Sequence, residues 1–581
     1  MNQKRTLLLL GTVIIIAGLL AALALLAGEE PELDTAAVPA ATSPVALPPA
    51  TASAAVAGDS PTATVESLTM PELSLEQQVG QTLMVHFDGL TADSTLRRLI
   101  TECHVGGIIL FGPNVRDPNQ VQQLVAEAQA LAVANGAPLP LFVAVDQEGW
   151  PITRLGGVVT TFPSNMAVAA TGDLELARQV GKATGLELRR LGINMNLAPV
   201  LDVNTNPDNP VIGLRSFGSD PQRVAQFGVA MAGGLQDAGV MAVGKHFPGH
   251  GSTVEDSHLT LPRLEQPAAQ LAAVDLVPFQ AAIEGDIGAI MTAHIVVPDL
   301  TNGLPATLSS AALTDLLRTQ MGYEGLIATD SLGMGAIVRH YGAAEAAIMS
   351  LEAGADLLMY GNDPGQAPEL QLQVCQALQD EARRDAEFAA RVAAASDRIL
   401  QAKQALPPAG SDAVAVDVAA HHELARAAAA SSVTVVRDEL GQLPLPKDEP
   451  VLWIFPEDLT RFAELAMLRV QVQLFPVERA PGQAQINEAV TAAQSAAHVV
   501  VVTVDGRDNP QQAALVEALL PYDPVLVAMG LPYDAGRFAA PTALATYGHP
   551  DVAQEMVSDV LFGEIQPSGT LPVPVEQPPA R

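Results

Sequence analysis

Continuously apolar segments alternate with amphipathic helical patterns from residue 73 to residue 405. This alternation is the sequence feature that most restricts which fold the chain can adopt. Strands without a polar face are typical of an α/β fold whose parallel sheet is covered by helices on both sides. We expect eight such strands, at Leu83–Phe87, Gly107–Phe111, Leu141–Val145, Ile193–Pro199, Val240–Gly244, Ala289–Ala293, Leu326–Thr329 and Leu357–Tyr360. Their number predicts a (β/α)8 barrel of the TIM type rather than an open, doubly wound sheet.

A smaller open-sheet α/β domain is predicted at residues 415–581. Pro407 and Gly410 interrupt the pattern after residue 405, so residues 406–414 are predicted to be a linker. Beyond it lie six β-rich runs, Val433–Val436, Val451–Phe455, Val470–Leu474, Val499–Val504, Val525–Met529 and Ala543–Thr546. This domain has no phosphate loop and no GxGxxG motif, so we predict no cofactor for it.

The amino terminus is predicted to be a membrane-targeting segment. Lys4 and Arg5 precede an uncharged apolar run from Leu7 to Gly28, which is about the 20 residues that span a bilayer. The basic flank is expected to stay inside, so the rest of the chain is expected to be exported and anchored, with residues 1–28 as its only membrane contact. A cleaved signal peptide remains the alternative. Residues 29–72, rich in Pro, Ala and Thr, are predicted to be a linker.

The charge balance and the cysteine content exclude several classes of function. With 64 acidic and 30 basic residues the net charge is −34, and a nucleic-acid-binding protein needs a basic face instead. Two cysteines, Cys103 and Cys375, are too few for a disulfide framework, and we interpret them as buried thiols. No Cys/His cluster indicates structural zinc, and no metal or organic cofactor is predicted.

Polar residues follow four of the predicted strands, where the carboxyl ends of barrel strands form a common face. Asp146 follows the third strand, and Lys245 and His246 follow the fifth. His294 and Asp330 follow the next two. Side chains in the same phase of successive strands converge, so we expect one pocket built from distant parts of the sequence.

The segment from Lys245 to His258 holds three histidines and two acids. His246 and His250 have the spacing of two zinc ligands on a helix, but Pro248 and Gly249 lie between them, so we predict no metal here. Asp256 stands two residues before His258. A carboxylate bonded to one imidazole nitrogen fixes the tautomer and raises the basicity of the other, so His258 is a candidate proton shuttle.

The run from Lys245 to Pro262 resembles the KHFPGHGxTxxDSHxxLP signature of the β-N-acetylglucosaminidase (β-hexosaminidase) branch of glycoside hydrolase family 3. Further segments resemble that family in order and spacing: Leu75 to Gln81, Asp146-Gln147-Glu148-Gly149, Asn196 to Val203, Arg215-Ser216-Phe217-Gly218, Met291 to His294, Pro305 to Ser309 and Ala328 to Met334. The resemblance covers residues 73–405 well and reaches the second domain through Leu443 to Leu445 and Pro567 to Val573.

The resemblance implies a retaining exo-β-N-acetylglucosaminidase acting on terminal β-linked N-acetylglucosamine of cell-wall (peptidoglycan) or chitin-derived fragments. By the resemblance, Asp330 is the nucleophile that forms a covalent glycosyl-enzyme, His258 is the acid/base and Asp256 is its partner. The implied substrate-binding residues are Asp146, Arg154, Arg215, Lys245 and His246. Asp202 is expected to brace the barrel mouth rather than touch sugar.

Three alternatives stay open: a β-glucosidase-type enzyme, a phosphorolytic enzyme of the same family, and an inactive sugar-binding wall protein. The Asp256-Ser257-His258 loop favours acetylglucosamine, because the β-glucosidase relatives usually take their acid/base from the second domain. Two departures from the family pattern stand out. Trp150 and Pro151 replace a glycine and an arginine, so Trp150 is a candidate to stack on a sugar or cap the cleft. Ser252 replaces a common aspartate.

Overall fold

The computed structural model describes residues 72–257, 260–363, 369–407, 415–466, 469 and 471–576. These residues belong to one compact unit. The predicted N-terminal segment and the acid/base candidate His258 lie outside them. Within the described ranges, no helix combines the length and the apolar character that crossing a bilayer requires.

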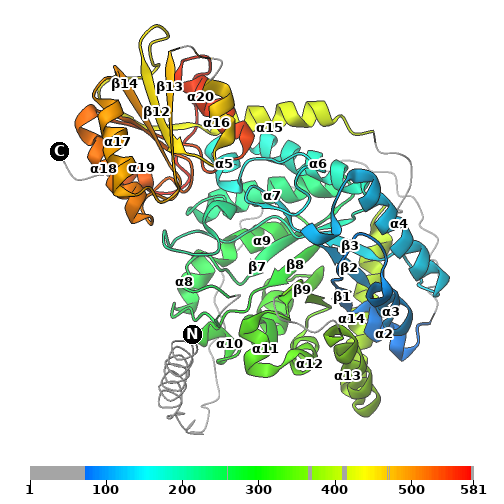
Figure 1. The fold of residues 1–581 in the computed structure, drawn as a ribbon. Coiled ribbons are helices and arrows are strands. Elements are labelled where there is room, and N and C mark those ends of the chain that lie inside the picture. The colour runs from blue at the N-terminus through cyan, green and yellow to red at the C-terminus, as the bar shows by residue number, and fades with distance from the viewer. Residues whose placement is uncertain are drawn as a thin grey trace, which may run out of the picture. The chain divides into compact units, whose positions relative to one another are not determined.

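Eight parallel strands close into a barrel, which confirms the predicted fold class (Figure 1). Their order around the barrel is β1-β10-β9-β8-β7-β6-β3-β2. They are β1 (Leu83–Val85), β2 (Gly107–Leu110), β3 (Phe142–Val145), β6 (Met195–Asn196), β7 (Met241–Phe247), β8 (Ala289–Thr292), β9 (Leu326–Ser331) and β10 (Leu357–Tyr360).

Several strands are shorter than expected, β6 most of all, with Met195–Asn196 in place of Ile193–Pro199. Two strands run past their expected carboxyl ends. β7 extends past Gly244 to Phe247, because Lys245 and Phe247 still pair with Met291 and Thr292 of β8. On its other side, Lys245 O accepts the Leu201 N–H at 2.6 Å. β9 likewise extends to Ser331, so Asp330 lies within the strand end rather than after it.

Helices surround the barrel, and several of the longest begin at an aspartate. The carboxylates of Asp93, Asp117, Asp173, Asp220 and Asp385 each accept a backbone N–H of the first turn, which satisfies a donor that the helix leaves unpaired. The covering helices are α2 (Leu75–Gln81), α3 (Ser94–Cys103), α4 (Pro118–Ala134), α6 (Leu174–Arg190), α7 (Pro221–Asp237), α9 (Leu276–Glu284), η4 (Ala311–Gln320), α11 (Gly335–Tyr341), α12 (Ala343–Ala353), α13 (Leu370–Arg384) and α14 (Ala386–Ala405).

The barrel is filled by side chains and is not a pore. Five methionines from five strands form one buried cluster with Phe142, namely Met84, Met195, Met241, Met291 and Met359. Alternate residues of the barrel strands, such as Ile108, Val143 and Ile290, belong to a second cluster shared with the surrounding helices. This packing supports the strand ends that carry the site.

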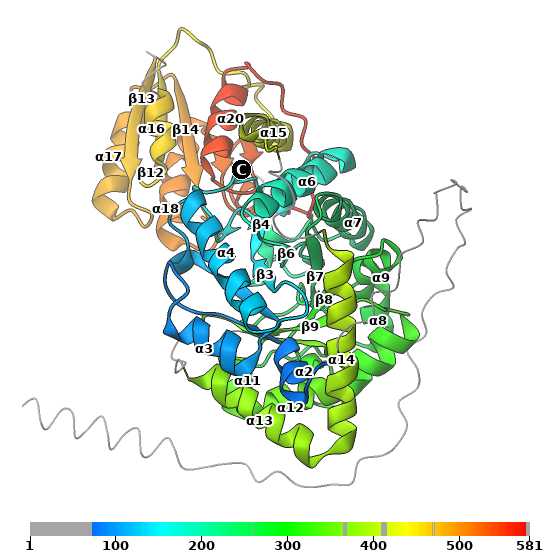
Figure 2. The same cartoon turned by 90° about the vertical axis from the view of Figure 1, so that its right-hand side faces the viewer.

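The second domain is a six-stranded sheet of order β11-β16-β15-β14-β12-β13, with only β11 antiparallel to its neighbour (Figure 2). Its strands are β11 (Thr434–Asp438), β12 (Val451–Pro456), β13 (Val472–Val477), β14 (His498–Thr503), β15 (Val525–Ala528) and β16 (Thr542–Ala545). Trp453 packs with α16 (Thr460–Ala466) and α20 (Asp551–Leu561), while Leu452 and Ile454 pack with α17 (Gln483–Ala493) and α18 (Pro510–Leu519). The sheet is therefore covered on both faces.

A small apolar cluster joins the two domains. Met166 and Ala170 of α5 (Asn165–Ala170) pack with Ala545, Tyr547 and Val573 of the second domain. Beside it, the Ser164 hydroxyl donates to Tyr547 O at 2.6 Å. The second domain is thus attached to the barrel beyond the chain connection at α15 (Val418–Ser432).

Cys103 and Cys375 are buried, but the interpretation that they are thiols was wrong. The structure joins them in a disulfide between the end of α3 and the middle of α13, with Cα atoms 6.2 Å apart. The two helices pack together although the cysteines are 272 positions apart. Their pairing depends on barrel closure, which brings the two ends of the barrel sequence together.

This disulfide can be tested by counting thiols. In protein isolated without reductant and then unfolded, neither cysteine should react with iodoacetamide, and both should react after reduction. Mass spectrometry of the peptides that contain Cys103 and Cys375 measures the difference. Two alkylated cysteines before reduction would restore the interpretation as thiols.

Candidate active site

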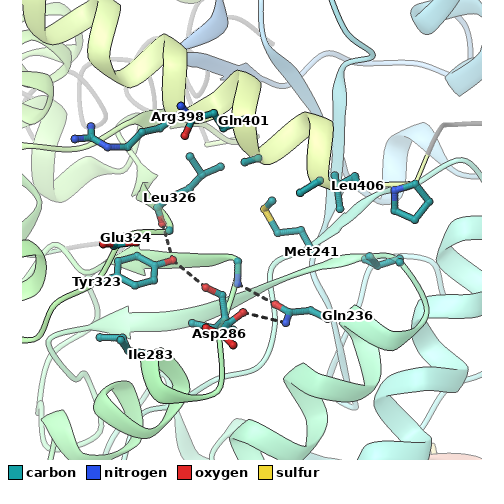
Figure 3. Close-up of a pocket in the computed structure, with 18 of the residues that line it drawn as sticks. Gln236, Met241, Ile283, Asp286, Tyr323, Glu324, Leu326, Arg398, Gln401 and Leu406 are labelled. Atoms are coloured by element: carbon teal, nitrogen blue, oxygen red, sulfur yellow. Dashed lines mark hydrogen bonds between the residues drawn. The ribbon is translucent and has the colours of Figure 1, made fainter. Parts of the chain in front are cut away.

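Two cavities lie at opposite ends of the barrel. The one at the amino ends of β7, β8 and β9 has a volume of about 690 Å³ and is lined by residues that include Met241, Leu326 and Arg398 (Figure 3). Its polar groups largely bond to one another: Gln236 Nε2 donates to Asp286 O at 3.1 Å, and Tyr323 OH donates to Leu326 O at 3.1 Å. This end of a barrel serves stability rather than chemistry.

The second cavity, of about 240 Å³, lies at the carboxyl ends of the strands. It gathers six of the eight predicted site residues in its wall: Asp146, Arg154, Arg215, Lys245, His246 and Asp330. Ser257, which precedes His258, is also in the wall. Asp256 is half-buried in the same loop but does not line the cavity. The convergence expected from the strand ends is therefore present for Asp146, Lys245, His246 and Asp330. His294 was expected in the same pocket but is buried outside its wall, with its ring nitrogens 2.8 Å from Thr307 Oγ1 and Ser331 O.

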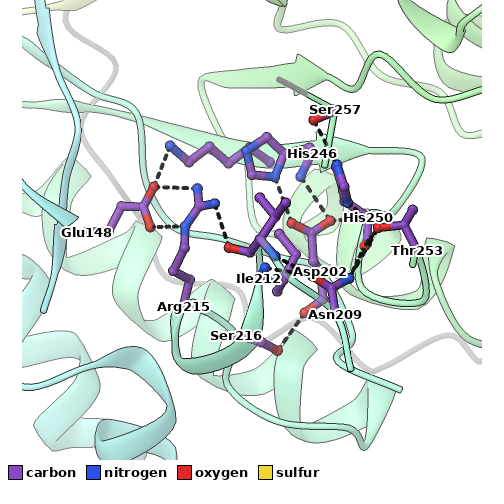
Figure 4. Close-up of polar contacts among 12 residues, drawn as sticks. Glu148, Asp202, Asn209, Ile212, Arg215, Ser216, His246, His250, Thr253 and Ser257 are labelled. Carbon is purple, nitrogen blue, oxygen red and sulfur yellow. Dashed lines mark hydrogen bonds and ion pairs between the residues drawn. The ribbon is translucent and has the colours of Figure 1, made fainter. Parts of the chain in front are cut away.

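A mostly buried network of four charged side chains forms part of this cavity, and Figure 4 labels two of them, Glu148 and Arg215. Lys245 Nζ lies 2.6 Å from both Asp146 Oδ1 and Glu148 Oε1. Arg215 binds both oxygens of Glu148, with its Nε and Nη2 atoms at 2.8 and 2.9 Å. Such bidentate pairing fixes the orientation of the guanidinium as well as its position.

Three charges in this network, those of Glu148, Lys245 and Arg215, hold one another in the ionised state. Burial opposes the charge of Glu148, but Arg215 and Lys245 hold the pKa of its carboxyl well below the usual range. Burial likewise opposes the charge of Lys245, yet Asp146 and Glu148 raise the pKa of its ammonium group. Glu148 in turn raises the pKa of the buried Arg215 guanidinium. Glu148, Lys245 and Arg215, which with Asp146 form the polar floor of the cavity, are therefore charged together.

Glu148 was not among the predicted site residues. It was visible only as part of the Asp146-Gln147-Glu148-Gly149 segment, which forms β4 (Gln147–Gly149) of a short hairpin with β5 (Ile152–Thr153). Its partners lie 67 and 97 positions further along the chain. The sequence did contain a signal for Glu148. It stands two residues after Asp146, and residues two apart lie on the same side of an extended segment.

Asp202 was expected to brace the barrel mouth. It does so at the start of the histidine-rich loop, which is the segment from Lys245 to His258. Its Oδ2 lies 2.7 Å from His246 Nδ1, and its Oδ1 accepts the backbone N–H groups of His246 and His250 at 3.2 and 2.7 Å. Burial opposes its charge, but His246 and these hydrogen bonds lower the pKa of Asp202. A carboxylate on Nδ1 orients His246, whose ring is in the cavity wall.

His250 ties the two halves of the loop together. Its Nδ1 lies 2.8 Å from Thr253 Oγ1, and its Nε2 lies 2.9 Å from Ser257 Oγ. No group of His, Cys, Asp and Glu side chains suited to a metal ion occurs within the described ranges, which include His246 and His250. Through its two ring nitrogens, His250 connects Thr253 to Ser257, the residue directly before His258.

Asp330 and Arg154 occupy different parts of the cavity wall. Asp330 lies at the end of β9, where its Oδ1 accepts the Ser331 N–H at 2.7 Å. Ser331 Oγ bonds to Asp363 and accepts the Gly361 N–H at 2.8 Å, which ties the ends of β9 and β10 together. Arg154 is exposed at the rim, with its guanidinium 5.9 Å from the centre of the Phe111 ring.

The two departures from the family pattern lie outside the cavity wall. Trp150 packs edge-on against His549 of the second domain, with ring centres 4.5 Å apart. Its side chain is therefore engaged by protein, which argues against the expectation that it stacks on a sugar. The Ser252 hydroxyl is buried and finds no hydrogen-bond partner among the residues that the structure describes.

Replacing Glu148 by glutamine should destabilise the protein strongly, because two buried cations lose their shared counter-charge. We expect Glu148→Gln to lower the free energy of unfolding by about 3–5 kcal/mol, measured by urea denaturation. The matched control is Glu324→Gln, the same change at an exposed glutamate at the opposite end of the barrel. Equal stability of the two variants would contradict the charge-balance account.

The pH dependence of stability should carry a contribution from His250. Burial lowers the pKa of His250 to about 4, whereas its ordinary value is 6.5. The unfolded chain then binds more protons between these values, so stability falls as pH decreases from about 6.5 to about 4, by up to about 1.4 kcal/mol per pH unit.

Urea denaturation of wild type and His250→Gln from pH 4 to pH 7 isolates this contribution. Burial raises the pKa of Asp275 to about 7, so this carboxyl acts with the opposite sign and stabilises the protein as pH falls. It is present in both proteins and cancels in their difference. A difference that does not change with pH would show that His250 is not held neutral.

Comparisons with known proteins show the family of the chain. Residues 74–402 match the family model described as the glycosyl hydrolase family 3 N-terminal domain. The chain is 30% identical to β-hexosaminidase A of Pseudoalteromonas piscicida over 87% of its own length and 97% of that protein. It is 40% identical to β-hexosaminidase LpqI of Mycobacterium tuberculosis over 50% of its length and 73% of the relative.

A solved structure is similar across both domains. The family 3 β-N-acetylglucosaminidase of Paenibacillus sp. str. FPU-7 is 38% identical, with a TM-score of 0.78, and the match covers 87% of this chain and 99% of that one. The family match, these relatives and the closed barrel followed by an α/β sheet domain agree with one another. The chain therefore belongs to glycoside hydrolase family 3 and is a glycoside hydrolase of its β-N-acetylglucosaminidase branch.

Proposed function

We propose that the protein is a retaining exo-β-N-acetylglucosaminidase that removes terminal β-linked N-acetylglucosamine through a covalent glycosyl-Asp330 intermediate. One observation carries the proposal: Asp330 lies in the wall of the same cavity as the Asp146, Glu148, Arg215 and Lys245 network. A carboxylate nucleophile thus faces a charged, rigid floor suited to sugar hydroxyls. The relatives named β-hexosaminidase and β-N-acetylglucosaminidase support the choice of sugar.

The proposed reaction has two steps. In the first, Asp330 attacks the anomeric carbon, the bond to the leaving oxygen breaks, and His258 donates a proton to that oxygen. In the second, His258 takes a proton from water, the water oxygen bonds to the anomeric carbon, and the Asp330 carboxylate leaves. Ser257 is in the cavity wall, which supports placing the acid/base function on the residue that follows it.

A histidine suits both steps near neutral pH. Its ordinary pKa is close to 6.5, so one group exchanges the proton in each direction without a large pKa shift. Asp256, two positions earlier in the same loop, is the proposed partner that fixes the tautomer. In glycosidases that use two carboxylates, the acid must have its pKa raised instead.

The polar floor has a distinct role in binding. Asp146 accepts hydrogen bonds from sugar hydroxyls, a type of contact that strengthens in the transition state. Arg215 and Lys245 hold Asp146 and Glu148 in place and, with His246 and Arg154, complete the wall around the terminal sugar. Preorganised charges of this kind lower the barrier without rearranging during the reaction.

The proposed setting is outside the cell membrane, with residues 1–28 as anchor and peptidoglycan or chitin-derived fragments as substrates. The Cys103–Cys375 disulfide supports export, because disulfides persist mainly in oxidising compartments. Export brings the active site to the cell wall, where β-linked N-acetylglucosamine is exposed.

The nucleophile assignment predicts a large loss of activity in Asp330→Asn. We expect the release of 4-nitrophenol from its β-N-acetylglucosaminide to fall by about 1000-fold or more, because the variant cannot form the covalent intermediate. The control is Asp315→Asn, an exposed aspartate of the same barrel outside the cavity wall. Retained activity in Asp330→Asn would assign the nucleophile elsewhere.

The same assay separates the alternatives. Turnover of the β-glucoside instead of the acetylated substrate would support a β-glucosidase. Formation of a sugar 1-phosphate when phosphate is added would support phosphorolysis. Binding of N-acetylglucosamine without turnover of either substrate would support an inactive sugar-binding protein.

A further inference from the structure

The segment from Asn204 to Ser219 connects the second domain to the catalytic face. It follows β6 and carries Val211 and Arg215, both in the cavity wall. Unlike a short barrel loop, it has no regular structure apart from the single turn η2 (Gly213–Arg215). Because it lacks regular structure, the segment needs contacts with other parts of the molecule to keep Arg215 in place for its two bonds to Glu148.

The second domain supplies those contacts along the whole segment. Arg507 Nη2 lies 2.8 Å from Asp208 Oδ1 and donates to Pro207 O at 3.1 Å. Asn204 Nδ2 donates to Tyr533 OH at 3.4 Å, and Ser219 N donates to Pro572 O at 3.2 Å.

Arg507 is itself held firmly. The buried Asp534 carboxylate accepts the Gly506 and Arg507 N–H groups at 2.8 and 2.7 Å, and the guanidinium lies 5.1 Å from the centre of the Tyr533 ring. Its side chain is 21% exposed, although Asp208 opposite is 74% exposed. These contacts hold Arg507 in place, and Arg507 in turn restrains the more exposed part of the segment around Asp208.

The same segment bonds on its other side to the histidine-rich loop (Figure 4). Asn209 Nδ2 donates to His250 O at 2.8 Å, and Asn206 Nδ2 donates to Thr253 O at 2.9 Å. The approach is close, because a Cβ on Gly251 would lie 1.9 Å from Val203 O. Contacts therefore run continuously from Arg507 through Asp208 and Asn209 to the loop that carries Asp256 and His258.

We propose that Arg507 of the second domain is a positioning residue, which sets the acid/base loop through the segment Asn204–Ser219. The second domain then contributes to proton transfer without reaching the sugar. The kinetic part of this inference rests on the proposed function. The mechanical part, that Arg507 restrains the segment, does not.

The kinetic test compares Arg507→Gln with wild type on two leaving groups, using the full chain. 4-Nitrophenol leaves readily without a proton, whereas the sugar alcohol of N,N'-diacetylchitobiose needs the general acid. A displaced acid should lower kcat/KM by about 10-fold for the disaccharide and by about 2-fold for the nitrophenyl substrate. The 10-fold loss is a part of the 100- to 10,000-fold that general acid catalysis supplies. Arg507→Lys, which keeps the charge but not the planar guanidinium group, should give an intermediate loss of kcat/KM.

The control is Arg537→Gln, an exposed arginine of the same domain that pairs with Glu517. It should leave both substrates unchanged. Equal losses on the two substrates in Arg507→Gln would assign Arg507 a role in folding alone and overturn the proposal, as would unchanged kinetics.

Hydrogen exchange tests the mechanical part separately. Peptides covering residues 204–219 and 249–257 should exchange faster in Arg507→Gln than in Arg537→Gln, while the barrel strands stay protected. Unchanged exchange in these peptides would overturn the proposal whatever the kinetics. Faster exchange in a protein whose wild type cleaves neither substrate would instead refute the proposed function and leave the restraint by Arg507 standing.

Discussion

The buried carboxylate of Glu148, held between Arg215 and Lys245, is the interaction on which the catalytic face depends. Three segments far apart in the sequence meet there: the hairpin after β3, the segment after β6 and the strand β7. A buried charge without a partner costs free energy, so Glu148, Arg215 and Lys245 must stay close together in the folded protein. The network thereby turns separate strand ends into one surface, against which Asp330 and the histidine-rich loop are arranged.

Much of this architecture follows from periodicity. The eight apolar segments predicted the barrel, and the polar residues in phase with their carboxyl ends predicted which side chains meet, as the shared cavity of Asp146, Lys245 and Asp330 shows. The length of β7 was missed, because Lys245 and His246 interrupt its apolar pattern although the strand goes on pairing with β8 as far as Phe247. Glu148 and the Cys103–Cys375 disulfide were missed for a related reason, since both depend on partners that barrel closure brings together.

The conformation of the histidine-rich loop depends on its own residues, and its position depends on contacts with distant segments. Its own residues provide the bonds of His250 to Thr253 and Ser257. Asp202 and Asn209, from the strand-end segment before it, fix where that folded loop sits. The motif alone therefore predicts the chemistry, whereas its placement relative to Asp330 comes from the rest of the barrel. Trp150 shows the converse, since a residue within a recognisable motif is used for contact with the second domain.

The apolar cluster that joins the domains also limits how the chain can be divided. Met166 and Ala170 on the barrel meet Tyr547 and Val573 on the sheet domain, with Leu214 and Leu531 at the edge of the cluster. A barrel produced by cutting the chain at the linker would present these side chains to water as one patch. Exposed patches of this kind promote self-association. This chain is therefore a poor candidate for shortening to a minimal catalytic barrel unless the surface of α5 is redesigned with polar residues.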